Sequence, residues 1–369
     1  MLKQIISFFR TDKAPGITLM LAGLVAMIIS NSTLAPSYFN LINTKEPFNL
    51  TFIVNDILMT IFFLDIGLEI KHQIVTGNLS NTRQIALPTI AAIGGVIVPA
   101  LIFVGFNIHD PIAITGWAIP TATDTAFALG VIMLLGKRVP LSLRVLLLAI
   151  AIIDDIIAVI IIAAFYTHSI SLLFLGFTTL CILALMYLNY KDKSSLVHYL
   201  MVGILLWICM YSAGIHPIIA GVIIGLSMPI TVRDQIHHKL YIWVSFVILP
   251  IFALTNAGIP LDNISFNDVL KPLPLSIALA LFIGKQLGIF VFAWLAIKAK
   301  ITSLPKHMSL RQLYGMAILC GIGFTMSIFI SNLSYGNSGE DYILLAKVGI
   351  LVGSSISAVF GYLFLRVWP

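Results

Sequence analysis

The sequence predicts an all-α protein that crosses a membrane about twelve times. Of its 369 residues, 59% are hydrophobic and only 10% are charged, and the mean hydropathy is +1.05. A soluble domain carries roughly 25% charged residues. Apolar runs of about 20 residues, the length that crosses a bilayer, recur along the whole chain. No polar stretch is long enough to form a soluble domain, so we expect one transmembrane domain over residues 1–369.

Twelve apolar segments are candidates for these spans. The first follows Lys3, Arg10 and Lys13 and could be a signal peptide, but the many spans behind it favour an uncleaved helix. The seventh and eighth are short, and only a tight turn before His216 separates them. The expected spans lie near residues 14–31, 51–73, 86–107, 112–134, 141–166, 170–189, 196–211, 214–228, 238–258, 274–297, 311–333 and 341–365.

The charges of the loops indicate the orientation. All lysines and arginines lie in loops on one side, except Lys45, Lys271 and Lys347 on the other side and Lys285 inside a span. Because basic loops stay in the cytoplasm, we expect that side to be cytoplasmic, with both termini inside. The net charge of +6 is therefore spread over short loops, and we expect no nucleic-acid partner.

The fourth and eleventh spans, near 112–134 and 311–333, are poor continuous helices. Pro120 removes a backbone donor from the fourth, and Gly321 and Gly323 weaken the eleventh. Two interrupted segments in separate halves of a chain are typical of inverted repeats that cross at a binding site near the membrane midplane. The sequence therefore predicts inverted repeats with two interrupted helices that cross there.

The strongest functional signal is the adjacent pair Asp154 and Asp155 in the middle of the fifth span. Each charge there costs roughly 2.5–3.5 kcal/mol on insertion scales, and such residues usually serve a function. Neighbouring helical residues point about 100° apart, so one carboxylate can face a cavity while the other faces a helix. Two close carboxylates titrate as a coupled pair, and protons can then compete with a cation. The alternative is a buried pair that hydroxyls or a lysine satisfy, with no transported ion.

Three further residues belong to this candidate site. Thr123 would add an oxygen ligand for a hard cation such as Na⁺. Asp124 would neutralise the positive N-terminal ends of the interrupted helices, and direct binding of the cation is the alternative. Lys285, deep in the tenth span, would neutralise negative C-terminal ends or pair with an aspartate, and the alternative is a lysine that snorkels to the interface.

A second group of ionisable residues lies near the cytoplasmic ends of the spans. Glu69, in the second span, could line an entry funnel or form a loop salt bridge. His237 and His238 begin the ninth span on the same side, and imidazoles titrate in the range that a pH response needs. Asp65 lies deeper in the second span, and its role is not assigned.

The sequence predicts neither an enzyme nor a resident cofactor. No cluster has zinc-ligand spacing, and no phosphate-binding loop appears. ATP is therefore not expected as the energy source, which leaves an ion gradient. The cysteines all lie in apolar spans and are expected to pack there as free thiols: Cys181, Cys209 and Cys320.

The order and spacing of these residues resemble the NhaA family of sodium/proton antiporters over nearly the whole chain. This family is itself one of the known examples of inverted-repeat transporters with interrupted helices. The matching stretches include Asn55-Asp56, Leu64-Asp65-Ile66-Gly67-Leu68-Glu69, Thr123-Asp124-Thr125, Ile153-Asp154-Asp155, Asn256-Ala257-Gly258, Gly284-Lys285 and Gly321-Ile322-Gly323-Phe324-Thr325.

The resemblance implies a twelve-helix protein of the bacterial inner membrane, surrounded by lipid and often a homodimer. Its activity would be the export of Na⁺ or Li⁺ in exchange for protons, for sodium and pH homeostasis, with more protons entering than cations leaving. The family's cation-binding pair, crossing-helix residues, membrane lysine and funnel glutamate match, in that order, Asp154 and Asp155, Thr123 and Asp124, Lys285, and Glu69. In the family, the lysine is thought to pair with the first of the two aspartates.

The chain also departs from the family pattern. After the funnel glutamate the family commonly has Lys-Arg-Glu, and this chain has Lys71, His72 and Gln73. An acidic residue often found at the start of the ninth span is replaced in the region of His237. Both positions are associated with the pH response, so we expect transport to be kept and its pH range to differ.

The sequence leaves three other functions as alternatives: a symporter, an intramembrane protease and a retinal protein. A sodium-coupled symporter of an organic acid would need an apolar pocket with polar anchors for the solute. An intramembrane aspartyl protease would typically carry a Gly-x-Gly-Asp motif, but Phe324 follows Gly323 here. A retinal protein bound at Lys285 is a weaker alternative, which a colourless purified sample would exclude.

Overall fold

The chain is helical throughout the part that the structure describes, with no strand in that part. The structure is a computed structural model and describes residues 13–44, 49–77, 82–167, 171–191, 195–305, 308–336 and 339–368. Two compact units are distinguished: unit 1 draws on residues 1–39, 81–158 and 253–369, and unit 2 on 40–80 and 159–252. Some residues that contributed to the predicted orientation lie outside the described residues: Lys3, Arg10, Lys45, Lys193 and Lys306.

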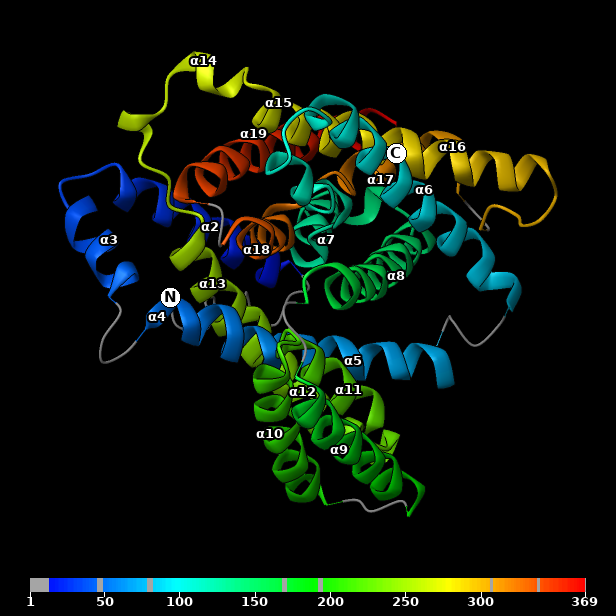
Figure 1. The fold of residues 1–369 in the computed structure, drawn as a ribbon. Coiled ribbons are helices and arrows are strands. Elements are labelled where there is room, and N and C mark those ends of the chain that lie inside the picture. The colour runs from blue at the N-terminus through cyan, green and yellow to red at the C-terminus, as the bar shows by residue number, and fades with distance from the viewer. Residues whose placement is uncertain are drawn as a thin grey trace, which may run out of the picture. The chain divides into compact units, whose positions relative to one another are not determined.

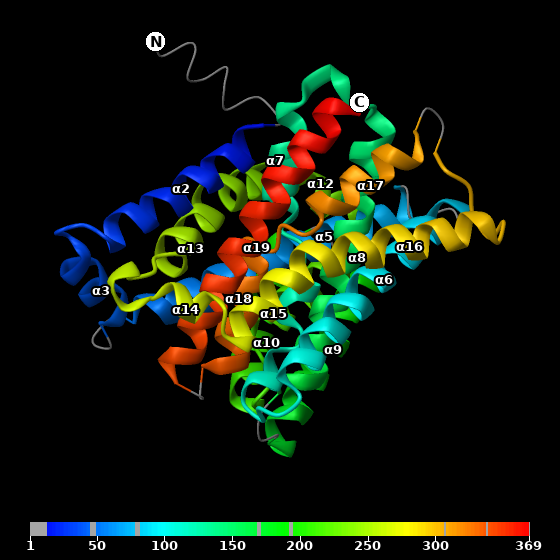
Figure 2. The same cartoon turned by 90° about the horizontal axis from the view of Figure 1, so that it is seen from above.

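Unit 1 contains both interrupted spans (Figure 1). Its principal helices are α2 (Ala14–Ser30), α6 (Thr82–Asn107), α7 (Thr125–Leu134), most of α8 (Leu141–Phe165), the end of α13 (Leu249–Asn256), α14 (Phe266–Val269), α15 (Pro272–Leu279), α16 (Lys285–Lys298), α17 (Leu310–Leu319), α18 (Phe324–Tyr335) and α19 (Glu340–Val367). Figure 2 shows α16 running beside α6, and these two helices are extensively packed against each other.

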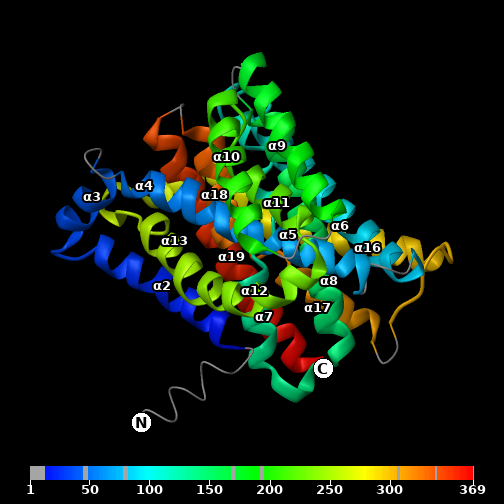
Figure 3. The same ribbon diagram turned by 90° about the horizontal axis from the view of Figure 1, so that it is seen from below.

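Unit 2 is built from the second span and the spans that follow α8. Its helices are part of α3 (Ala35–Asn43), α4 (Leu50–Phe52), α5 (Met59–Val75), α9 (Leu172–Tyr190), α10 (Leu196–Ala213), α11 (Ile218–Ser227) and α12 (Ile230–Trp243). In Figure 3, α9 and α10 lie side by side, and α11 packs against α5. The predicted tight turn between the seventh and eighth spans is present, because α10 ends at Gly214 with a left-handed φ of 80°.

Glycines let several helices approach closely. A Cβ atom on Gly94 of α6 would meet the carbonyl oxygen of Gly288 on α16, and the reverse is also true. In unit 2, a Cβ on Gly221 of α11 would meet the carbonyl oxygen of Thr60 on α5. Small residues at such crossings are the usual means of packing helices in a membrane, where hydrophobic burial does not drive association.

Among the described residues, three spans contain a turn of π-helix that the sequence analysis did not predict. They are η1 (Ile53–Leu58), η6 (Val244–Ile248) and η8 (Ala280–Gly284). A π-turn widens a helix locally and is often found at functional sites. The last of them ends directly before Lys285, the first residue of α16.

Each of the twelve predicted spans corresponds to an apolar helix or to a bent pair of helices in the structure. Eight helices of the described residues are long and apolar enough to cross a membrane, and three further spans are bent pairs. The pair α2 and α3 bends by 112°, and the two interrupted spans bend by 41° and 46°. The predicted eighth span is the shorter apolar helix α11. The prediction of an all-α polytopic membrane protein is confirmed.

Candidate cation-binding site

The two interrupted spans meet at their breaks in unit 1. The first breaks between the short helix η4 (Ile119–Thr121) and α7, and the second between α17 and α18. The backbone N–H of Asp124 donates to the carbonyl oxygen of Ile322 at 2.6 Å. The hydroxyl of Ser327, on α18, donates to the carbonyl oxygen of Ile119 at 2.7 Å. The predicted breaks near Pro120 and Gly321 are therefore present, and each break supplies hydrogen-bond partners to the other.

Asp124 joins the beginnings of two helices. Its Oδ1 accepts the N–H of Phe127 in the first turn of α7, at 2.9 Å. Its Oδ2 accepts the N–H of Thr325 in the first turn of α18, at 3.0 Å, and also the Thr325 hydroxyl at 2.5 Å. A helix N-terminus carries partial positive charge and unpaired N–H groups. The side chain thus lies where one carboxylate can neutralise both helix ends.

Asp154 and Asp155 are buried in the middle of α8, with 2% and 6% of their surfaces exposed. Oδ2 of Asp154 accepts the ammonium of Lys285 at 2.5 Å and the hydroxyl of Thr123 at 2.8 Å. The same Thr123 hydroxyl lies 2.9 Å from the carbonyl oxygen of Cys320, and its single proton can serve only one of these acceptors at a time. Thr123 therefore connects the aspartate to the second break.

Each aspartate keeps one buried oxygen free. Oδ1 of Asp154 and Oδ1 of Asp155 have no hydrogen-bond partner among the described residues. Buried polar atoms without partners are rare and need an explanation. Carboxylate oxygens, and the hydroxyl of Thr123 that bonds to Asp154, are the kind of donors that hard cations prefer. The arrangement can bind a small cation or protons.

Lys285 is fully buried, with an exposed fraction of 0%, and does not snorkel to an interface. The sequence analysis gave two possible partners for its ammonium, an aspartate or the C-terminal helix ends. In the structure the ammonium pairs with Asp154. A buried ammonium and carboxylate stabilise each other only as a pair, since each alone is costly to bury.

Glu69 belongs to a separate ionic cluster in unit 2. Its Oε2 lies 2.9 Å from the guanidinium of Arg233 and 3.3 Å from Nε2 of His237, both on α12. His237 also lies 3.8 Å from Asp65. Its neighbour His238 makes no ion pair within the described part of the chain. The sequence analysis did not single out Arg233, although the i, i+4 spacing of these residues on two helices could have indicated it.

The departure at Gln73 has a structural consequence in the same cluster. The side-chain amide of Gln73 donates to Oε1 of Glu69 at 2.7 Å, so the residue that replaces a family acid is a neutral hydrogen-bond donor. In the π-turn η1, which precedes α5, Asp56 lies 3.8 Å from His216. The three cysteines are free and buried, as predicted.

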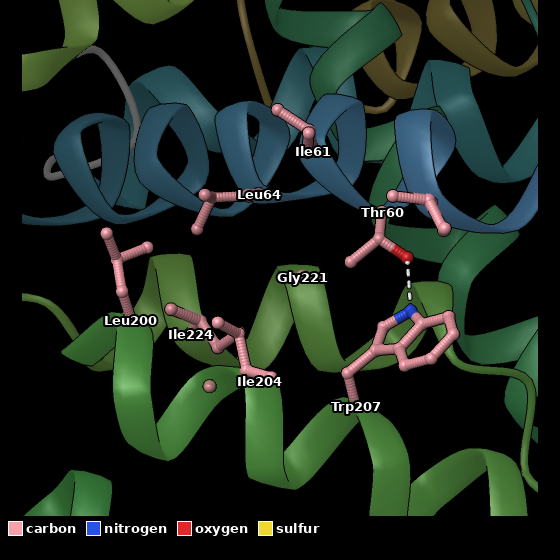
Figure 4. Close-up of a pocket in the computed structure, with 10 residues that line it drawn as sticks. Thr60, Ile61, Leu64, Leu200, Ile204, Trp207, Gly221 and Ile224 are labelled. Atoms are coloured by element: carbon pink, nitrogen blue, oxygen red, sulfur yellow. Dashed lines mark hydrogen bonds between the residues drawn. The ribbon is translucent and has the colours of Figure 1, made fainter. Parts of the chain in front are cut away.

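A cavity of about 310 Å³ lies in unit 2 between α5, α10 and α11 (Figure 4). Aliphatic side chains line it, and its indole and hydroxyl, from Trp207 and Thr60, hydrogen-bond to each other at 2.9 Å. The Thr60 hydroxyl in turn donates to the carbonyl oxygen of Asp56 at 2.5 Å, so both polar groups of this cavity have hydrogen-bond partners. Among the described residues, no three His, Cys, Asp or Glu side chains are grouped so that they could hold a metal ion.

These features define a class of protein: a multi-pass helical membrane protein with a buried carboxylate site at the crossing of two interrupted helices, as in ion-coupled secondary transporters. The family model described as "Na+/H+ antiporter 1" matches residues 6–365. The chain belongs to this family of Na⁺/H⁺ antiporters, whose members are transporters and not enzymes.

Similar proteins from several bacteria extend this finding. The Na(+)/H(+) antiporter NhaA of Aliivibrio salmonicida is 46% identical over 371 residues, which cover 98% of this chain and 97% of the relative. That of Aeromonas hydrophila is 44% identical, covering 98% and 95%. NhaA 1 of Klebsiella pneumoniae is 45% identical, covering 99% and 96%. The resemblance drawn from the sequence motifs is confirmed.

Proposed function

We propose that this chain is an electrogenic antiporter that exports Na⁺, or Li⁺, in exchange for protons, and that Asp154 and Asp155 bind both. The observation that carries the proposal is the buried oxygen without a hydrogen-bond partner on each of these adjacent aspartates, the first of which accepts the Thr123 hydroxyl through its other oxygen. Family membership supports the exchange itself. The organic-acid symporter is not favoured, because the chain belongs to a family of Na⁺/H⁺ antiporters.

The exchange begins with the site open to the cytoplasm. Asp154 and Asp155 lose their protons and take up Na⁺ through carboxylate oxygens, with the Thr123 oxygen as a further ligand. The loaded site then opens to the outside, where protons displace the cation and return inward on the same carboxylates. Since one set of groups holds either the cation or protons, the two cannot cross together in the same direction.

Lys285 and Asp124 balance charge in this cycle. The Lys285 ammonium, paired with Asp154, compensates the site when the cation has left. Binding of Na⁺ competes for the same carboxylate, so the ion pair breaks as the cation enters and the lysine can release a proton. Asp124 neutralises the starts of α7 and α18 throughout, which lets these positive helix ends lie beside a cation site.

The remaining proposals concern the setting of the site. Glu69, His237 and His238 would form the cytoplasmic funnel and set the pH at which transport begins. The whole chain, 1–369, would work as one antiporter domain in a bacterial inner membrane. By the positive-inside rule, both of its termini would lie in the cytoplasm. More protons than cations would cross per cycle, and the membrane potential supplies about 2.3 kcal/mol per net charge per 100 mV. Surrounding lipid and a homodimer would complete the assembly.

Proteoliposomes with an internal pH dye test the central proposal. With an acidic interior and Na⁺ added outside, wild type is expected to alkalinise the interior between pH 6.5 and 8.5. Asp155→Asn should abolish this signal. Asp110→Asn, an aspartate outside the spans, should leave it unchanged. Absence of sodium-driven proton movement in wild type at every pH would overturn the antiporter proposal, and full activity in Asp155→Asn would exclude the proposed site.

A further inference from the structure

The second break receives a hydroxyl from the last helix, α19. Oγ of Ser354 accepts the backbone N–H of Gly323 at 3.2 Å and that of Phe324 at 3.1 Å. Ser354 is buried, with 3% of its surface exposed, so water does not compete for these bonds. A hydroxyl oxygen has two lone pairs, and both are engaged. Ser354 is thus a built acceptor for the beginning of α18.

The start of α18 is shared between a neutral group and a charged one. The first N–H groups of a helix have no partner within the helix and must be satisfied from elsewhere. Ser354 takes those of Gly323 and Phe324, and Asp124 takes the next one, that of Thr325. The carboxylate therefore does not hold this helix end alone, and it keeps acceptor capacity for the start of α7.

The same break carries two carbonyl groups that touch the candidate site. The carbonyl oxygen of Cys320 lies within hydrogen-bond distance of the Thr123 hydroxyl, and that of Ile322 accepts the N–H of Asp124. Gly323 follows Ile322 directly, and Cys320 lies three residues before it. A shift of the Gly323 backbone would therefore move the carbonyl of Ile322 that accepts from Asp124. Through the two intervening residues it would also move the carbonyl of Cys320 beside the Thr123 hydroxyl, which approaches Asp154.

We infer that Ser354 is a positioning residue for the cation site: by holding the N–H groups of Gly323 and Phe324, it fixes the break whose carbonyls orient Thr123 and Asp124. The inference rests on the proposed function, since it assumes that Thr123 and Asp154 meet the cation. The hydrogen bonds of Ser354 within the described part of the chain go to the backbone of the second break, so it acts on the cation ligands through that backbone.

The chain provides a matched control one helical turn away. Ser357, also on α19, is fully buried, and its hydroxyl makes no hydrogen bond among the described residues. It lies against the same break, because a Cβ on Gly321 would meet its oxygen. Ser357→Ala thus removes a buried oxygen beside the break without removing a hydrogen bond, whereas Ser354→Ala removes two.

The test compares the Na⁺ dependence of exchange in proteoliposomes for Ser354→Ala, Ser354→Thr and Ser357→Ala. Ser354→Ala should raise the KM for Na⁺ about tenfold, with the maximal rate within about twofold, because two buried donors lose their acceptor and the site loosens. Ser354→Thr keeps the acceptor and should restore the KM, and Ser357→Ala should match wild type. An unchanged KM in Ser354→Ala, or an equal rise in Ser357→Ala, would overturn the inference.

Hydrogen exchange gives a readout that does not depend on transport. In wild type the amides of Gly323 and Phe324 should exchange slowly, and Ser354→Ala should accelerate them about tenfold while Ser357→Ala does not. If Ser354→Ala does not fold, Ser354→Cys, with a weaker acceptor of similar size, should show the same changes to a smaller degree, and wild-type behaviour in that variant would overturn the inference. Asp155→Asn in the proteoliposome transport assay separates the two proposals. Na⁺/H⁺ exchange that depends on Asp155 but not on Ser354 removes only the positioning role, and a wild type without Na⁺/H⁺ exchange removes both.

Discussion

The replacement of Asp124 by asparagine distinguishes the two roles that the sequence left open for this residue. The carboxylate accepts hydrogen bonds from the N–H of Phe127 and from the N–H and hydroxyl of Thr325, and the N–H of Ala126 also interacts with it. A carboxylate offers about four acceptor positions, so little capacity remains for a cation. Geometry therefore favours neutralisation of the helix ends over direct binding.

The size of the effect follows from these contacts. An asparagine at position 124 keeps one acceptor oxygen and points an NH₂ group at an N–H donor. Losing one charge-assisted bond costs about 1.5–3 kcal/mol, and losing the charge at two helix starts costs about 0.3–1 kcal/mol each. Relief from burying a charge offsets part of this loss. We expect Asp124→Asn to lower the free energy of unfolding by about 2–4 kcal/mol.

Thermal unfolding in detergent and Na⁺-dependent transport together test this reasoning. Asp124→Asn should melt several degrees below wild type, lower the maximal rate, and leave the KM for Na⁺ within about twofold. Asp110→Asn is the control, because Asp110 also accepts the N–H groups of Ile112 and Ala113 at a helix start but faces solvent. A large rise in KM with an unchanged melting temperature would refute the reasoning and make Asp124 a direct ligand.

Three further outcomes are expected. Lys285→Met leaves the carboxylate of Asp154 buried without its ion-pair partner and should destabilise the protein by about 3–5 kcal/mol, of which adding Asp154→Asn should restore a part in a double-mutant cycle; wild-type stability of the single variant would contradict the pair. Gly221→Ala should sharply reduce the yield of folded protein in detergent, because the new methyl group meets the backbone of α5, whereas Gly176→Ala, with open space around it, should be neutral or slightly stabilising; equal yields would show that the close approach is not needed. Asp268 accepts a hydrogen bond from Lys271, which lowers its pKa most, and further hydrogen bonds from Ser265, and together they lower the pKa to about 2. The contribution of this carboxylate to stability is therefore present above the ordinary pKa of 3.8 and is lost as the pH falls through about 2. An NMR titration should find this carboxyl still ionised at pH 3, and a midpoint near 3.8 would refute the effect of these contacts.

The sequence by itself determined the class of protein, the spans and the positions of the breaks. These depend on local properties: the length of an apolar run, the donor that Pro120 lacks and the weak helix propensity of Gly321 and Gly323. The cost of a charge in the membrane is local as well, which is why Asp154 and Asp155 stand out without any structure. The π-turn before the membrane lysine was missed, since no sequence pattern here distinguishes it from ordinary helix.

The partners of these residues were decided only by the tertiary structure. The residues alone did not say which aspartate pairs with Lys285; only the family resemblance implied the first of the two, and the structure shows the pair with Asp154. Ser354 lies about 30 residues from the break that it holds, in an apolar helix where a serine carries no signal of its own. Hydrogen bonds reach only about 3 Å, so a contact between distant segments is defined by packing and not by any one segment's sequence. The sequence thus identifies which buried groups need partners, and the fold determines which residues those partners are.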